Sequence, residues 1–194
     1  MMILVTGGAS SGKSAYAEQV ACALPAPHFY LAAMKPFGEE GARRVARHRA
    51  LRAGKGCITI ECYDGLDDVA ESVFEASPSL LCSSGNLPVH GTALLESLGN
   101  VVANAQFADD GSCATYEEAL KTVMEGVVSV AGAFENLVIV GDEVGGDGMR
   151  YDDATETYIK LIGSAACAIA ARCDVVVECV AGQPLVVKGD SPFK

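Results

Sequence analysis

Eight residues near the start of the chain have the types and the spacing that bind the phosphates of a nucleotide. They match the pattern G-x-x-x-x-G-K-[ST], in which backbone N–H groups turn inward around a phosphate and a Cβ would obstruct the chain. In such a loop Lys13 reaches the β- and γ-phosphates, and the hydroxyl of Ser14 ligates Mg²⁺. The predicted nucleotide-binding residues of this phosphate loop are Gly7, Gly8, Ala9, Ser10, Ser11, Gly12, Lys13 and Ser14.

The segments on either side of the phosphate loop are those that the motif requires. Met2–Thr6 is a short apolar run that predicts a buried strand, and the composition of Ala15–Cys22 favours a helix. The N-terminus of that helix adds the positive end of its dipole to the phosphate site. A glycine-rich turn with a stray lysine is the alternative, but it does not explain the strand and the helix. The sequence therefore predicts a nucleoside triphosphate site.

Carboxylates follow two other predicted strands. Ala93–Glu96 is an apolar run that ends in a carboxylate, and Leu137–Val140 is followed closely by Asp142. Because Mg²⁺ prefers oxygen ligands, the predicted metal ligands are Glu96, Asp142 and Ser14. An ordinary strand end and a polar turn are the alternatives for the two carboxylates.

Strands alternate with helices along the chain, which indicates an α/β fold with one domain over residues 1–194. We expect a P-loop NTPase-type three-layer sandwich, with a mostly parallel central sheet and a C-terminal antiparallel hairpin. Ligands of such sheets bind beyond the carboxyl ends of the strands, so Ala33, Met34 and Lys35 should share one crevice with the phosphate loop and the carboxylates. Other strands are expected at His28–Ala33, Ile58–Cys62, Val175–Val180 and Pro184–Lys188, and helices at Glu39–Arg52, Gly65–Ala76, Tyr116–Phe134 (which Gly126 could break) and Asp153–Arg172.

The composition argues against several classes of protein. The formal net charge of −11 argues against a general nucleic-acid binder, and no apolar run approaches the length of a membrane span. The chain enters its first predicted strand without a secretory signal, and its eight cysteines include no C-x-x-C pair, which gives a zinc site little support. We therefore expect a cytoplasmic protein whose cysteines are mostly thiols within apolar elements.

One segment concentrates basic residues in this acidic chain. The predicted helix Glu39–Arg52 carries few large apolar side chains, so it should not be a core helix. Glu40, Arg44 and His48 recur at four-residue spacing and share one of its faces. A neutral imidazole is available as a nucleophile near pH 7, and guanidinium groups pair well with phosphate oxygens. From the residues alone, the more ordinary interpretation of His48 is a polar residue on a solvated helix.

Three stretches taken together resemble one family. The phosphate loop, the basic helix and Asp142–Gly145 resemble the adenosylcobinamide kinase/adenosylcobinamide-phosphate guanylyltransferase family of cobalamin biosynthesis. That family pairs G-G-x-R-S-G-K-S with a helix of the form E-M-x-x-R-I-x-x-H-[RK]-x-x-R and a later [ND]-E-V-G, and the order and spacing hold over nearly the whole chain. The helix pattern is matched by Glu40, Arg44, Val45, His48, Arg49 and Arg52.

The resemblance implies an enzyme with two activities. It would phosphorylate the aminopropanol hydroxyl of adenosylcobinamide and then transfer GMP from GTP to that phosphate, with His48 as the catalytic residue that becomes guanylylated. The resemblance implies Mg²⁺ and GTP (or ATP) as cofactors, a corrinoid as substrate and, by analogy, a homo-oligomer. The further nucleotide-binding residues that we expect are Ala33, Met34, Lys35, Arg49, Ala50, Leu51, Arg52, Glu61 and Glu96.

The chain departs from the family pattern at several places. Ser10 stands where the family loop has arginine, and Asp153–Arg172 lacks the arginine, aspartate and asparagine of the family's last helix. Two other functions therefore stay open. One is a P-loop small-molecule kinase in which His48 is structural, and the other is a non-catalytic nucleotide-binding regulatory protein.

Overall fold

The computed structural model describes residues 1–36, 38–39, 41, 43, 45–47, 56–76 and 89–193. The strands are β1 (Met2–Thr6), β2 (His28–Ala32), β3 (Cys57–Glu61), β4 (Val89–Glu96), β5 (Phe134–Val140), β6 (Val175–Val180) and β7 (Gln183–Lys188). The helices are α1 (Lys13–Ala23), α3 (Val69–Ala76), α4 (Leu98–Gln106), α5 (Tyr116–Ala133) and α6 (Asp153–Arg172). Between β2 and β3, the described residues 38–39, 41, 43 and 45–47 are helical.

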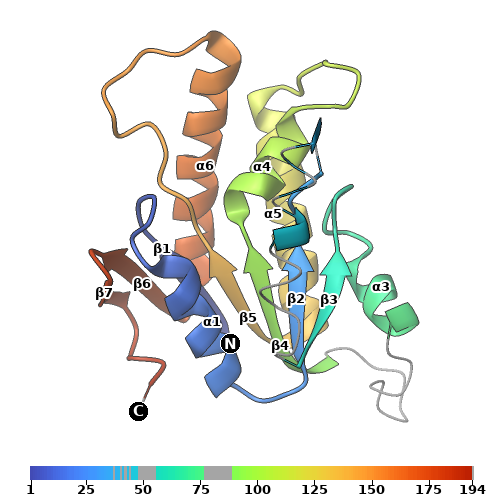
Figure 1. The fold of residues 1–194 in the computed structure, drawn as a ribbon, viewed down its shortest axis with the longest axis vertical. Helices are drawn as coiled ribbons and strands as arrows, with labels where there is room; N and C mark the ends of the chain where they lie inside the picture. Colours follow the sequence, from blue (N-terminus) through green and yellow to red (C-terminus); the bar gives the residue numbers. More distant parts are fainter. Residues whose placement is uncertain are drawn as a thin grey trace.

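The seven strands form one sheet in the order β3-β2-β4-β5-β1-β6-β7 (Figure 1). β1 lies near the middle, where it pairs in parallel with β5 on one side and with β6 on the other. The strand that leads into the phosphate loop is therefore held on both edges. β7 runs antiparallel to β6 at the border of the sheet.

Alternate residues of the strands face two different helical layers. Ile3 and Val5 of β1 pack with α1, whereas Leu4 belongs to the larger core under α3, α4, α5 and α6. All three side chains are almost fully buried, as expected for a parallel strand that is covered on both faces. Figure 1 shows α1 on one face of the sheet and α5 behind it. The predicted three-layer α/β fold is confirmed.

The predicted C-terminal hairpin is also confirmed. Ala181 and Gly182 join β6 to β7 with φ angles of 50° and 78°. Positive φ at both central residues defines a type I′ turn, whose twist matches that of the flanking strands. The hairpin thus ends in a tight turn beside the phosphate loop.

Some boundaries differ from the sequence prediction. The helix expected from Gly65 begins only at Val69, after a turn, and β4 begins at Val89 rather than at Ala93. α5 continues through Gly126 without a break, and Leu66 packs closely against the helix at this glycine. Residues 77–88 lie outside the described residues.

The expectation for the cysteines is only partly correct. Cys62, Cys173 and Cys179 are buried, but Cys22, Cys113 and Cys167 are exposed. The exposed ones occupy outward positions of α1 and α6 or precede α5, so an apolar element does not bury every residue in it. None of the helices in the described ranges is long and apolar enough to cross a bilayer.

Candidate active site

The phosphate loop joins β1 to α1 as the sequence predicts. Gly7 and Gly12 have φ angles of 149° and 92°, in the region that favours glycine, and Ser10 has a φ of 59°. A Cβ built on Gly7 would lie 2.5 Å from the carbonyl oxygen of Cys179 in β6, so no larger residue fits there. α1 begins at Lys13, directly after the loop.

The turn of the β6–β7 hairpin supports this loop from the side. The N–H of Gly182 donates to the carbonyl oxygen of Ser11 over 2.9 Å. A Cβ built on Gly12 would lie 3.3 Å from the Cα of Gly182. Because the two turns touch through their backbones, the conformation of the phosphate loop depends on the hairpin.

Lys13 lies between the phosphate loop and the next strand. Its Nζ donates to the carbonyl oxygen of Gly8 over 3.2 Å and lies 3.5 Å from Oδ1 of Asp142. The contact follows from the sheet register, since Val5 of β1 pairs with Val140 of β5 and Asp142 follows two residues later. Only 12% of the Lys13 side chain is exposed, so its charge is directed into the site.

Asp142 is held in one orientation by groups from two helices. Its Oδ2 accepts a hydrogen bond from the N–H of Gly99 in α4 over 3.1 Å, which leaves Oδ1 toward Lys13. The hydroxyl of Tyr158 in α6 donates to the carbonyl oxygen of Gly99 over 3.1 Å. Burial and the charge of Asp142 raise the pKa of Tyr158, so this phenol keeps its proton near neutral pH.

Glu96 belongs to a different part of the same strand edge. Its Oε2 accepts a hydrogen bond from the hydroxyl of Tyr30 in β2 over 2.6 Å. β4 is separated from β1 by β5, and two strand spacings amount to about 10 Å. Glu96 therefore lies at the same edge of the sheet as the phosphate loop, but it is nearer to β2 than to that loop.

Lys35 connects two loops above the end of β2. Its Nζ lies 3.2 Å from Oδ1 of Asp109 and 3.5 Å from Oδ1 of Asp64. The hydrogen bond that Lys35 donates to Asp109 raises the pKa of Lys35, so the ammonium group stays charged. Nearby, Asn104 of α4 donates to the carbonyl oxygen of Ala33 over 2.8 Å. These contacts order the segment in which Ala33, Met34 and Lys35 are predicted to bind nucleotide.

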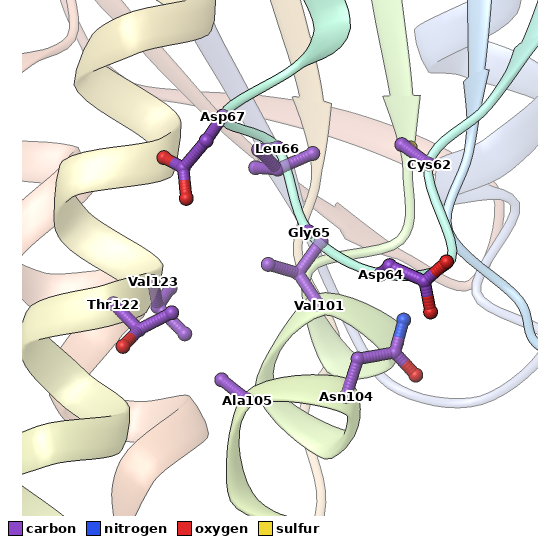
Figure 2. A pocket seen from close by; sticks show the side chains of 10 residues that line it. All are labelled: Cys62, Asp64, Gly65, Leu66, Asp67, Val101, Asn104, Ala105, Thr122 and Val123. Atoms are coloured by element: carbon purple, nitrogen blue, oxygen red, sulfur yellow. The ribbon is translucent and has the colours of Figure 1, made fainter.

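Two neighbouring pockets share the loop that follows β3. One is a polar pocket of about 220 Å³, lined by Glu61, Cys62, Tyr63, Asp64, Gly65, Asp68, Val69 and Ser72. The other, of about 60 Å³, is shown in Figure 2, with Asp64 and Asn104 at one side and Thr122 of α5 at the other. Glu61, at the end of β3, thus lines the larger of these two pockets.

The family model for cobinamide kinase / cobinamide phosphate guanyltransferase matches residues 3–187 of the chain. The chain belongs to this family. Membership confirms the sequence prediction of a nucleotide-dependent transferase of this class. The match covers the phosphate loop, the basic segment and the carboxyl ends of all five central strands.

Two curated relatives agree with this family assignment. The bifunctional adenosylcobalamin biosynthesis protein CobP of Pseudomonas aeruginosa is 28% identical over 191 residues, which cover 98% of this chain and 99% of that protein. The bifunctional adenosylcobalamin biosynthesis protein CobU of Salmonella typhimurium is 33% identical over 111 residues, 57% of this chain and 53% of that protein.

A solved structure supports the fold alone. It is that of a prototypical ATPase from the type III secretion system of pathogenic bacteria, and it has a TM-score of 0.51 and 14% identity to this chain. The likeness covers 91% of this chain and half of that one. The P-loop NTPase-type sheet is therefore found in a distant ATPase as well as in the cobinamide kinase family.

Several predicted site residues of this family member lie outside the described ranges. They are the proposed nucleophile and the residues that follow it, namely His48, Arg49, Ala50, Leu51 and Arg52. Their roles stay predictions. Within the described ranges, no three His, Cys, Asp or Glu side chains gather to hold a metal ion.

The sequence interpretation did not identify three described residues beside Asp142 and the phosphate loop. Gly99 and Tyr158 orient Asp142, and Gly182 supports Ser11. Each of them is far from its partner in the sequence, and each is of a common residue type. The dipeptide Ala181-Gly182 between two apolar runs was the one available signal, because glycine there indicates a tight turn.

Proposed function

We propose that this protein phosphorylates the aminopropanol hydroxyl of adenosylcobinamide and then transfers GMP from GTP to the resulting phosphate through a guanylylated His48. The observation that carries the proposal is the contact between Lys13 and Asp142 at the mouth of the phosphate loop. In this contact Lys13, the cation that binds the γ-phosphate, pairs with one oxygen of Asp142, and the other oxygen of Asp142 accepts a hydrogen bond from Gly99. This is the arrangement that phosphoryl transfer needs.

The first step uses the phosphate loop. Lys13 exchanges its contact with the carbonyl oxygen of Gly8 for the β- and γ-phosphates, whose negative charge is a stronger partner than a carbonyl. The loop N–H groups hold the nucleotide in line with the acceptor hydroxyl. The γ-phosphorus then forms a bond to that hydroxyl oxygen while its bond to the β-phosphate oxygen breaks, and the hydroxyl proton is released.

The residues present fit a magnesium ion. Ser14 offers a hydroxyl oxygen, and Asp142 offers Oδ1, since its Oδ2 is bonded to Gly99. One or two carboxylates together with substrate phosphates are the usual ligands of Mg²⁺ in such sites, so a cage of three acidic residues is not required. When bound, the ion neutralises charge on the phosphates. Glu96, about two strands from β1, suits the acceptor side of the site better.

The second step uses His48 as the nucleophile. A nitrogen of His48 attacks the α-phosphorus of GTP, the bond to the pyrophosphate oxygen breaks, and pyrophosphate leaves. A phosphate oxygen of the acceptor then displaces the histidine from the GMP group. Glu61 supports a preference for guanine, because its carboxylate can accept from the N–H groups of guanine, and it lines the polar pocket of about 220 Å³.

A kinase without guanylyl transfer is the second candidate. Ser10 is exposed and has no cationic group where the family loop has arginine, and α6 lacks the polar pattern of the family. γ-Phosphoryl transfer uses Lys13 and Mg²⁺ rather than a covalent histidine, so it can persist when guanylyl transfer does not. A homo-oligomer and a cytoplasmic location, which we expect by analogy, belong to the same proposal.

The first prediction tests His48. Incubation with GTP labelled at the α-phosphorus and Mg²⁺ should leave label on the protein that is labile in acid and stable in alkali, as expected for a phosphoramidate. His48→Asn should lose the label completely. His90→Asn is the matched control, because His90 lies on the exposed start of β4 and contacts only Glu135 among the described bonds.

The outcomes separate the candidate functions. Label that persists in His48→Asn, or that maps to His90, contradicts the proposed nucleophile. Transfer of γ-label to the corrinoid without any α-label on the protein supports the kinase alone. Nucleotide binding without turnover supports a regulatory protein.

A further inference from the structure

α6 extends well beyond the edge of the sheet at which the nucleotide binds. Its C-terminal end is fixed at the opposite edge, where the N–H of Asp174 donates to the carbonyl oxygen of Met2 over 2.8 Å. Its 20 residues span about 30 Å, whereas the five residues of β1 span about 17 Å. From these lengths, the first turns of α6 rise roughly 10 Å above the carboxyl ends of the strands. Figure 1 shows α6 extending above the sheet.

The chain between β5 and α6 must therefore extend from the carboxyl end of β5 up to the first turn of α6. These residues, 141–152, are called the β5–α6 loop here, and in Figure 1 they rise above the turn that joins β1 to α1. The loop begins at the site itself, because Asp142 contacts Lys13. It is ordered by bonds of its own: Asp147 accepts from the N–H of Met149 and from the hydroxyl of Tyr151. The β5–α6 loop is thus an ordered segment that begins beside the phosphate loop.

This loop presents apolar side chains to solvent. Met149 is 66% exposed, Val144 47% and Tyr151 41%. An ordered loop that exposes three large apolar side chains beside a phosphate site is a candidate contact surface for a ligand. The loop is also acidic, with four carboxylates and one arginine.

We propose that the β5–α6 loop receives the corrin macrocycle of the acceptor, with Val144, Met149 and Tyr151 against its apolar face. The inference rests on the proposed function, because it takes its ligand from there. Adenosylcobinamide combines a large, flat ring with a net positive charge, and the loop combines exposed apolar side chains with an excess of carboxylates. A ring seated about 10 Å above the strand ends can extend its aminopropanol arm down to the γ-phosphate at Lys13.

The double variant Val144→Ser/Met149→Ser tests this assignment. Equilibrium dialysis against adenosylcobinamide, followed by its visible absorbance, should give a dissociation constant that is at least tenfold higher than that of the unchanged protein. Calorimetric titration with GTP should give the same affinity in both. Val187→Ser/Leu185→Ser is the matched control, because Val187 and Leu185 are 64% and 53% exposed on β7, away from the crevice.

A second variant keeps the test independent of folding effects. Met149→Lys adds a positive charge beside a cationic ligand, so it should weaken corrinoid binding further, and added salt should reduce the difference. Corrinoid affinity that is unchanged in both loop variants, or that falls equally in the β7 control, overturns the assignment to the loop. Failure of the unchanged protein to bind adenosylcobinamide overturns the proposed function, and this inference with it.

Discussion

Asp142 is the residue at which three parts of the molecule meet. One of its oxygens faces Lys13 of the phosphate loop, and the other accepts from Gly99 at the start of α4. Tyr158 of α6 completes the arrangement by donating to the carbonyl oxygen of Gly99. A carboxylate fixed in this way needs little reorganisation when a nucleotide binds, which is the property that catalytic groups require.

Replacing Lys13 tests the phosphate site. Lys13→Met should raise the dissociation constant for GTP by roughly 100-fold or more, since two charge-assisted contacts to phosphates are worth about 1.5–3 kcal/mol each. The apolar stem of methionine fills the space of the lysine stem, so the fold should be retained. Calorimetric titration measures the effect.

Lys121→Met is the control for Lys13→Met. It changes the net charge by the same amount at an exposed residue that pairs only weakly with Glu125, 3.9 Å away. Its GTP affinity should equal that of the unchanged protein. Equal affinities for all three proteins would refute the assignment of the nucleotide site.

The close approach of α5 to the loop after β3 depends on one glycine. A Cβ built on Gly126 would lie 2.9 Å from the Cβ of Leu66, which is closer than side chains pack. Gly126→Ala should therefore lower the free energy of unfolding by about 1–3 kcal/mol, because the loop must shift to relieve the contact. Urea denaturation measures this change.

Gly163 supplies the opposite control. It lies within α6, and a Cβ there would meet nothing within 4 Å. Gly163→Ala should raise the free energy of unfolding by about 0.5–1 kcal/mol, because alanine loses less conformational entropy in a helix. If the two substitutions changed stability in the same direction, the packing explanation for Gly126 would be wrong.

Local patterns explain what the sequence could predict about the elements. Short apolar runs in the sequence predicted the strands β1, β2 and β6. The helix α6 was predicted with the bounds that the structure shows. The possible break at Gly126 does not occur, and the packing role of this glycine was not predictable because its neighbour Leu66 lies sixty residues earlier. The phosphate loop was predictable because its chemistry lies in eight consecutive residues. The partners of Asp142 were not, because sheet order brings them together.

At the scale of the whole molecule, hydrogen bonds to exposed carboxylates should set the acid limit of stability. Such bonds lower the pKa of Asp110, Asp147, Asp152 and Glu118 below their ordinary values of 3.8 and 4.5. A carboxylate whose pKa is lower in the folded state than in the unfolded state increases the free energy of unfolding, and this increase is fully present above the unfolded-state pKa. It is lost as the pH falls through the folded-state pKa. This contribution should persist from pH 7 to 5 and be lost below about pH 4.

The buried thiols should set the alkaline limit. Burial raises the pKa of Cys62 and Cys173 from 9.0 to about 12, so the folded state resists their ionisation. A thiol whose pKa is raised by folding contributes stability that is fully present at pH values below its ordinary pKa of 9.0. This contribution is lost as the pH rises above that value. Urea denaturation between pH 3 and pH 10 should give a plateau with two falling sides. A steady decline from pH 7 to 5 would contradict the acid limit.

The central position of β1 makes the nucleotide site one of the last parts of the molecule to form during synthesis. The ribosome delivers Met2–Thr6 first, but both strands that pair with it, Phe134–Val140 and Val175–Val180, come more than 120 residues later. The turn that supports the phosphate loop, at Gly182, comes later still. At ordinary rates of translation this delay is roughly 10 to 30 seconds. A nascent chain therefore carries the whole phosphate-binding motif long before it can use a nucleotide as a folding aid.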